Sequence, residues 1–91
     1  MTPLKLPASL LHAQANACLA QWVAQLPAAL PHQVVLDASD LVDFDSSALA
    51  VLLGLRRVLS QRGSALHIAG MTPRLRELAA LYGVLELLHA D

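Results

Sequence analysis

Apolar and polar positions along the chain predict strands that alternate with helices. Three short runs have the alternation or the β-branched content of strands, and each is followed by a stretch in which apolar residues recur at helical spacing. The predicted strands are residues 4–6, 33–36 and 65–69. The predicted helices are residues 9–26, 46–62 and 73–82, and residues 84–88 are predicted to form a last short strand or turn.

Capping residues mark where the second and third helices begin and end. Asp45 or Ser46 can cap the second helix, because a side-chain oxygen at its start accepts a hydrogen bond from an otherwise unpaired backbone N–H. Gly63 can adopt the left-handed conformation that ends this helix. Thr72 and Pro73 suit the cap and the first turn of the third helix. One apolar face of that helix is predicted to contain Leu75, Leu78, Ala79 and Tyr82.

The order of these elements indicates a single α/β domain over residues 1–91. Strands joined through helices pair in parallel, so we expect a small mixed or mostly parallel sheet of about four strands flanked by three helices. The length of 91 residues suits one domain. A hydrophobic fraction of 56% against 14% charged residues provides a core and excludes a disordered chain.

Charge and hydropathy exclude several kinds of partner and location. Six basic and seven acidic residues offer no basic stripe for a phosphate backbone, so we expect no nucleic-acid partner. The longest apolar run, residues 48–53, is too short to cross a bilayer, so we expect no direct membrane insertion. Cys18 is the single cysteine and excludes an intramolecular disulfide. A faint resemblance to a secretion signal before Cys18 is interrupted by His12 and Gln14, and we therefore expect a cytoplasmic protein.

No sequence motif of an enzyme or a metal site is present. The chain has neither a nucleophile elbow nor a glycine-rich phosphate loop, and its histidines do not have the spacing of metal ligands. The aspartates between residues 37 and 45 lack the central glycine and the distal glutamate of a calcium loop. We expect no catalytic residue, no cofactor and no metal, and an enzyme such as a nucleotide hydrolase is the least favoured hypothesis.

The second helix contains the best candidate for a binding surface. We expect its core side to face the sheet through Leu49, Leu52, Leu53 and Val58. On the opposite side, steps of three or four residues predict a narrow ridge of small and polar residues, flanked by Val51 and Leu55: Ser47, Ala50, Gly54, Arg57 and Gln61. A glycine inside a helix costs about 1 kcal/mol relative to alanine, so Gly54 indicates the close approach of another chain. The alternative is an ordinary exposed face.

Residues 34–37 and 41–53 resemble the central motif of STAS domains. The two stretches read Val-Val-Leu-Asp and Leu-Val-Asp-Phe-Asp-Ser-Ser-Ala-Leu-Ala-Val-Leu-Leu. The family motif likewise runs from a strand through an acidic loop and Asp-Ser/Thr-small-small-Leu into a helix. The resemblance extends over roughly residues 4–88. It implies a small sheet flanked by helices, without the family's first strand, and a non-catalytic docking role.

Two branches of this family imply different functions. In anti-sigma-factor antagonists the position of Ser46 is phosphorylated by a partner kinase, which would make this chain a partner-switching protein that binds an anti-sigma factor. The chain departs from those proteins at residues 8–11, where their Gly-Glu-Leu-Asp turn is missing, and at Ala48, where they have glycine. These departures favour the MlaB-type branch of small STAS subunits. Such a subunit would dock on the cytoplasmic ATPase of an ABC-type phospholipid transporter, stabilise its dimer and associate with the membrane through that complex.

The resemblance and the helix pattern together define the expected partner-binding residues. They are Asp45, Ser46, Ser47, Ala50, Gly54 and Arg57, and Ser46 is also the expected phosphorylation site. A homodimer is a further expectation left open, because the sheet is small and the helices are apolar.

Overall fold

The structure, a computed structural model, describes residues 4–90, with side chains described for residues 4–88. The strands are β1 (Leu4–Lys5), β2 (Ser9–Leu10), β3 (Gln33–Asp37), β4 (Asp43–Phe44), β5 (Ala65–Ala69) and β6 (His89–Ala90). The helices are α1 (His12–Gln25), α2 (Ser47–Gln61) and α3 (Pro73–Leu81), with a short 3-10 helix, η1 (Leu85–Leu87). Strands and helices therefore alternate as the sequence predicts.

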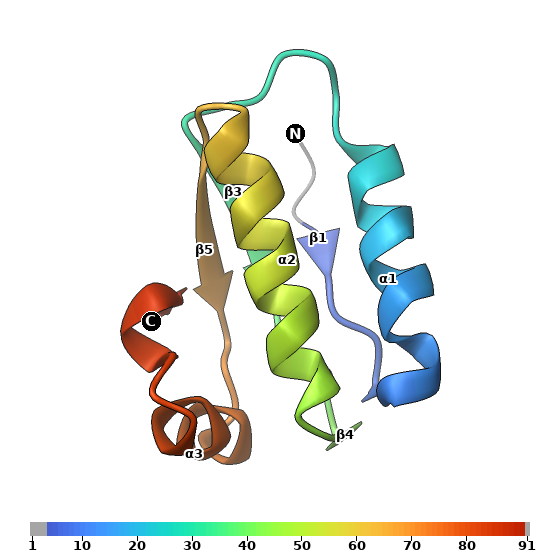
Figure 1. Cartoon of the computed structure of the whole chain (residues 1–91), viewed down its shortest axis with the longest axis vertical. Helices are drawn as coiled ribbons and strands as arrows, with labels where there is room; N and C mark the ends of the chain where they lie inside the picture. The colour runs from blue at the N-terminus through green and yellow to red at the C-terminus, as the bar shows by residue number, and fades with distance from the viewer. Residues whose placement is uncertain (1–3, 91) are drawn as a thin grey trace.

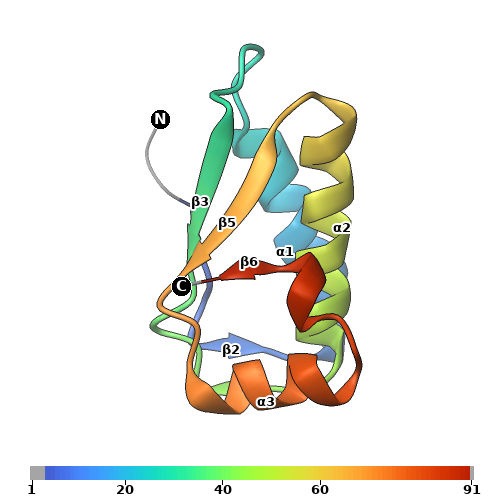
Figure 2. The same cartoon turned by 90° about the vertical axis from the view of Figure 1, so that its left-hand side faces the viewer.

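The main sheet has four parallel strands in the order β1-β3-β5-β6 within the described residues. In its register Leu4 lies opposite Leu36, and Val34 lies opposite Leu66. Helices α1 and α2 cover one face of this sheet side by side, and α3 lies across the end of the molecule where α2 begins (Figures 1 and 2). The prediction of a small, mostly parallel sheet flanked by three helices is confirmed.

The core lies between the sheet and α2. The side chains of Val34 and Leu36 in β3 and of Leu66 and Ile68 in β5 are buried, while the residues that alternate with them are more exposed. This period of two is the pattern expected of a sheet that packs helices on one face. Helix α2 contributes the fully buried Leu52, Leu55 and Leu59 to the same core.

The first helix begins three residues later than predicted. Ser9 and Leu10 form β2, which pairs in parallel with Asp43 and Phe44 of β4, and α1 starts at His12. Helical periodicity cannot reveal a pairing between segments more than thirty residues apart, so this part of the prediction is wrong. The last predicted strand or turn consists of η1 followed by β6, which pairs with β5.

The capping predictions are confirmed where the structure tests them. Gly63 has a φ of 77° after α2. The side chain of Thr72 accepts a hydrogen bond from the backbone N–H of Leu75, 3.3 Å away, and Pro73 is the first residue of α3. At the start of α2 the capping group is Asp45, whose Oδ1 accepts from the N–H of Ser47 at 2.8 Å.

Helix α2 is rotated relative to its predicted orientation. Val51 and Leu55, which were expected to flank an exposed ridge, are 3% and 0% exposed, whereas Leu53 and Val58 are only half-buried. The side that faces solvent follows a different set of three- and four-residue steps, and Leu53 is its least exposed member: Ser46, Ala50, Leu53, Arg57 and Ser60. The cause is α1, which packs along the side on which Gly54 lies. A helix that is apolar nearly all round does not define its own orientation from pattern alone.

Candidate functional site

The carboxylate of Asp45 joins the starts of α1 and α2. Its Oδ1 accepts the hydrogen bond from Ser47, and its Oδ2 accepts one from the backbone N–H of His12 at 3.1 Å. Both N–H groups belong to first turns that lack a partner within their own helices. Hydrogen bonding, chiefly from the backbone of Ser47, lowers the pKa of Asp45 below its usual value. Asp45 therefore fixes the geometry of the turn that leads into α2.

Ser47 makes a second contact between the same two helices. Its Oγ lies 3.2 Å from Nδ1 of His12, and the residue is half-buried. Because its hydroxyl group faces α1, Ser47 helps to hold the start of α2 against α1.

Gly54 also faces α1, and this corrects the reason that we gave for it. A Cβ atom placed on Gly54 would lie 2.9 Å from Cδ2 of Leu19, which is closer than real Cβ contacts. The close approach that the glycine permits is thus made by a helix of the same chain, not by another chain. At the far end of the two helices, Nη2 of Arg62 donates to the carbonyl oxygens of Pro27 at 2.6 Å and Ala28 at 3.2 Å.

The remaining candidate residues are accessible. Ser46, Ala50 and Arg57 are exposed on the outer side of α2. The hydroxyl group of Ser46 makes no hydrogen bond within the described part of the chain, including at the start of α2. The six expected partner-binding residues thus divide into three that a partner can reach and three that pack the helices together: Asp45, Ser47 and Gly54.

Helix α3 adds a groove beside Ser46 that the sequence analysis did not predict. The groove has a volume of about 380 Å³ and lies between the β4–α2 turn and α3. The wall on the side of α3 includes Leu81, which is 79% exposed, and Tyr82, which follows the helix and is 56% exposed. Across the groove the guanidinium carbon of Arg74 lies 5.2 Å from the ring centroid of Phe44, within range of a cation–π interaction.

The exposure of Tyr82 contradicts its expected place on one apolar face with Leu75. Leu75 and Ala79 are buried, but Tyr82 follows the last residue of α3, where the chain leaves the core. Gly83, which the sequence marks as the end of this helix, has a φ of 72° and turns the chain immediately after Tyr82.

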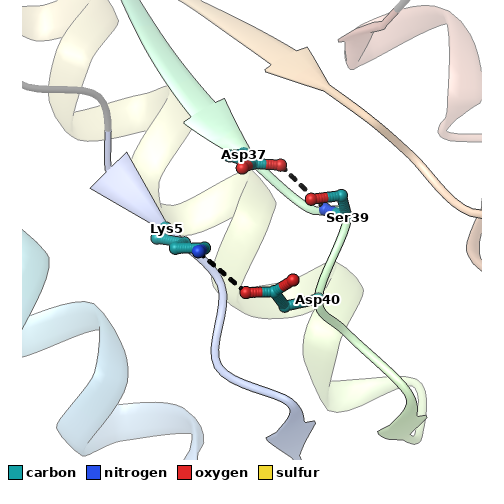
Figure 3. Close-up of polar contacts among 4 residues, drawn as sticks. All are labelled: Lys5, Asp37, Ser39 and Asp40. Atoms are coloured by element: carbon teal, nitrogen blue, oxygen red, sulfur yellow. Dashed lines mark hydrogen bonds and ion pairs between the residues drawn. The ribbon is translucent and has the colours of Figure 1, made fainter.

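Asp37, the last residue of β3, and Asp40, in the loop that follows, make separate contacts (Figure 3). Oδ2 of Asp40 forms an ion pair with Nζ of Lys5 at 2.8 Å, and this contact raises the pKa of Lys5. Oδ1 of Asp37 accepts from the backbone N–H of Ser39 at 2.9 Å, and hydrogen bonds from the side chain and backbone of Ser39 lower the pKa of Asp37. Among the described residues, no group of three or more His, Cys, Asp or Glu side chains is placed to hold a metal ion.

Comparisons with known proteins agree with this architecture. Residues 2–89 match the family model described as Mlab, STAS domain. A crystal structure of a sulfate transporter family protein from Wolinella succinogenes has the same fold, with a TM-score of 0.74 and 18% sequence identity, over 92% of this chain and 67% of that one. None of the curated proteins compared by sequence matches the chain. In the described residues no helix is both long and apolar enough to cross a membrane. The chain belongs to the STAS domain family and is of the MlaB type.

Proposed function

We propose that the protein is a non-catalytic subunit that docks on the cytoplasmic ATPase of an ABC-type phospholipid transporter and stabilises it. The observation that carries the proposal is the match to the MlaB-type STAS model over residues 2–89. STAS domains generally mediate contacts between proteins and are generally non-catalytic. The proposed partner implies a cytoplasmic location and an association with the membrane through the transporter complex.

The docking surface that we propose is the start of α2 together with the α3 side of the groove. It consists of Ser46, Ala50, Arg74, Leu81 and Tyr82. Ser46 and Ala50 are small and exposed, so a partner backbone can come close to α2. Leu81 and Tyr82 are exposed apolar side chains that gain from burial, and such residues beside polar ones are typical of interaction sites.

The contacts behind this surface favour docking because they hold it in place before a partner arrives. Asp45 connects the first turns of both helices, Ser47 contacts His12, and Gly54 lets Leu19 pack closely against α2. A surface that is already ordered loses less conformational freedom on binding. In this proposal Asp45, Ser47 and Gly54 contribute to docking by positioning the surface.

The proposal is tested by identifying and then measuring the partner. The tagged protein is used to isolate its partners from a lysate of its own organism, and mass spectrometry should identify an ABC-transporter ATPase subunit. Calorimetry with the purified ATPase then compares Ala50→Arg with Ala24→Arg, since Ala24 is an exposed alanine of α1. We expect Ala50→Arg to weaken binding by about tenfold or more, corresponding to about 1.4 kcal/mol, and Ala24→Arg to leave it unchanged. Recovery of no ATPase subunit, or equal effects of the two variants, would contradict the proposal.

A second candidate function, phosphorylation-controlled partner switching, is favoured by the accessibility of Ser46. Its hydroxyl group is exposed and without a hydrogen bond in the described part of the chain, so a kinase can reach it. A phosphoryl group would add a charge of about −1.5 to −2 next to Asp45. This charge would weaken the binding of a partner that recognises the unmodified surface. The test is incubation with ATP and a kinase encoded beside the gene, followed by intact mass measurement of wild type and Ser46→Ala. An unmodified wild-type protein would exclude this candidate.

A further inference from the structure

Two arginines of α2 have no partner among the residues that the structure describes. Arg56 and Arg57 make no ion pair or hydrogen bond with the residues that the structure describes. Other cations of the chain differ from them: Lys5 pairs with Asp40, Arg62 donates to backbone carbonyls, and Arg74 lies over Phe44. Interaction with the helix dipole does not account for the presence of Arg56 and Arg57 either. Both precede the last turn of α2, and the effect of the helix dipole is confined to that turn.

The same two arginines line a shallow groove on the outer side of α2. The groove has a volume of about 510 Å³, and its apolar walls are Leu53 of α2 and Leu87 of η1. Leu53 is half-buried and Leu87 is 43% exposed. A smaller groove on the other side of Arg56, of about 200 Å³, shares Arg56 and Ser60 with the first. The surface thus combines two cationic groups with two apolar side chains in one concave area.

We propose that this surface, formed by Leu53, Arg56, Arg57 and Leu87, binds an acidic amphipathic segment of a partner protein. Guanidinium groups form paired hydrogen bonds with carboxylates, so the complement of two free arginines is a segment with two suitably spaced Asp or Glu residues. An apolar side chain of the segment, one helical turn away, packs between Leu53 and Leu87.

The observations favour a protein segment over a membrane surface. Lipid-binding basic clusters generally contain about four to eight Lys or Arg residues, whereas this surface has two. The surface is also hollowed, and its leucines lie at the walls of a groove. A groove accepts a side chain of a peptide better than it accepts a planar bilayer.

This surface adjoins the proposed docking surface, because Leu53 follows Ala50 by three residues in α2, but its two arginines lie closer to the end of the helix. Arg57 follows Ser46 by eleven positions, and at about 1.5 Å per residue the two lie roughly 16 Å apart along the helix. The inference therefore does not require the ATPase to be the partner. Substitution at Ala50 tests the docking surface, and substitution at Arg56 and Arg57 tests this one.

The experiment uses a library of random short peptides displayed on phage. Selection is carried out against the full-length protein and, in parallel, against the Arg56→Glu/Arg57→Glu variant. We expect peptides enriched on the wild type alone to contain Asp or Glu three or four residues from Leu or Phe. The best peptide should perturb the amide NMR signals of Leu53, Arg57 and Leu87, and the double substitution should weaken its binding by about tenfold or more.

Two controls separate local charge from net charge. Arg57→Glu and the double substitution Gln21→Glu/Gln25→Glu, at two exposed positions of α1, change the net charge equally. We expect only Arg57→Glu to weaken binding of the selected peptide. Thermal unfolding of each variant verifies that it is folded, which is expected because Arg57 is exposed.

Other occupants of the surface would overturn the inference. Enrichment that does not depend on Arg56 and Arg57, or enrichment of neutral or basic peptides, would show that the surface does not select acidic segments. Binding to phosphatidylcholine vesicles containing phosphatidylglycerol that requires the two arginines, without peptide binding, would identify a membrane surface. Self-association in sedimentation experiments that the double substitution abolishes, again without peptide binding, would identify a second copy of the chain.

Discussion

The packing of α1 against Gly54 makes a quantitative prediction for Gly54→Phe. The substitution improves intrinsic helix propensity, which contributes about 0.5 kcal/mol of stabilisation. The phenyl ring, however, must enter the contact in which even a Cβ atom would lie 2.9 Å from Leu19. Overpacking of this kind costs about 1–3 kcal/mol, so we expect the free energy of unfolding to fall by roughly 0.5–2.5 kcal/mol.

A double-mutant cycle with Leu19→Ala shows where the cost arises. Leu19→Ala alone removes part of a half-buried side chain and should lower the free energy of unfolding. In the double variant the phenyl ring fills the space that Leu19 leaves, so the two losses should cancel in part, with a coupling energy of about 1 kcal/mol or more. Urea unfolding followed by far-UV circular dichroism measures all four proteins.

The matched control is Ala50→Phe, which introduces the same ring on the exposed side of α2. We expect it to change the free energy of unfolding by about 0.5 kcal/mol at most. Two results would refute the packing described for α2: a Gly54→Phe variant as stable as the wild type, or losses from Gly54→Phe and Leu19→Ala that simply add.

Three further predictions concern the core, the shared cap and a turn, and urea unfolding measures each of them. Leu52→Ala should lower the free energy of unfolding by about 2–5 kcal/mol, because the side chain is fully buried in the core; a loss below 1 kcal/mol would contradict its position. Asp45→Asn should lower the free energy of unfolding at pH 7, because an amide has one acceptor oxygen in place of the two charged oxygens that accept from His12 and Ser47. Because the folded-state pKa of Asp45 is lowered, its contribution is present above the unfolded pKa of about 3.9 and is lost as pH falls through the folded value. The stability difference between wild type and Asp45→Asn should therefore shrink below about pH 4, and a constant difference would exclude this role. Gly63→Ala should cost about 1 kcal/mol, because the residue has a φ of 77° with nothing near its Cβ position; a neutral effect would contradict the left-handed conformation.

The elements of this fold could be predicted because each has a local signal. The alternation of β3 and β5, the glycine after α2 and the Thr-Pro start of α3 are features of short segments, and all are present in the structure. The pairing of β2 with β4 is not local, since it joins residues 9–10 to residues 43–44, and it has no periodic signature. Periodicity therefore extended the first helix over a strand.

The candidate site could be predicted in part for a related reason. The Asp-Ser-Ser motif correctly identified the turn at the start of α2, because the motif and the turn are the same stretch of chain. The direction of Gly54 depends on where α1 lies, and the groove beside Ser46 depends on where α3 lies. Both are determined by packing between elements, which a single-sequence pattern does not contain.

The sharing of one carboxylate between α1 and α2 has a mechanical consequence. The two helices run in the same direction, with their starts joined at Asp45 and their ends joined by Arg62 to the segment after α1. A force that lifts the start of α2 away from α1 must break the hydrogen bond between Asp45 and the backbone N–H of His12, so this contact resists independent movement of the two helix starts. If a protein binds at Ser46, as we propose, any displacement that it imposes on the start of α2 also strains the contact that Asp45 makes with the start of α1.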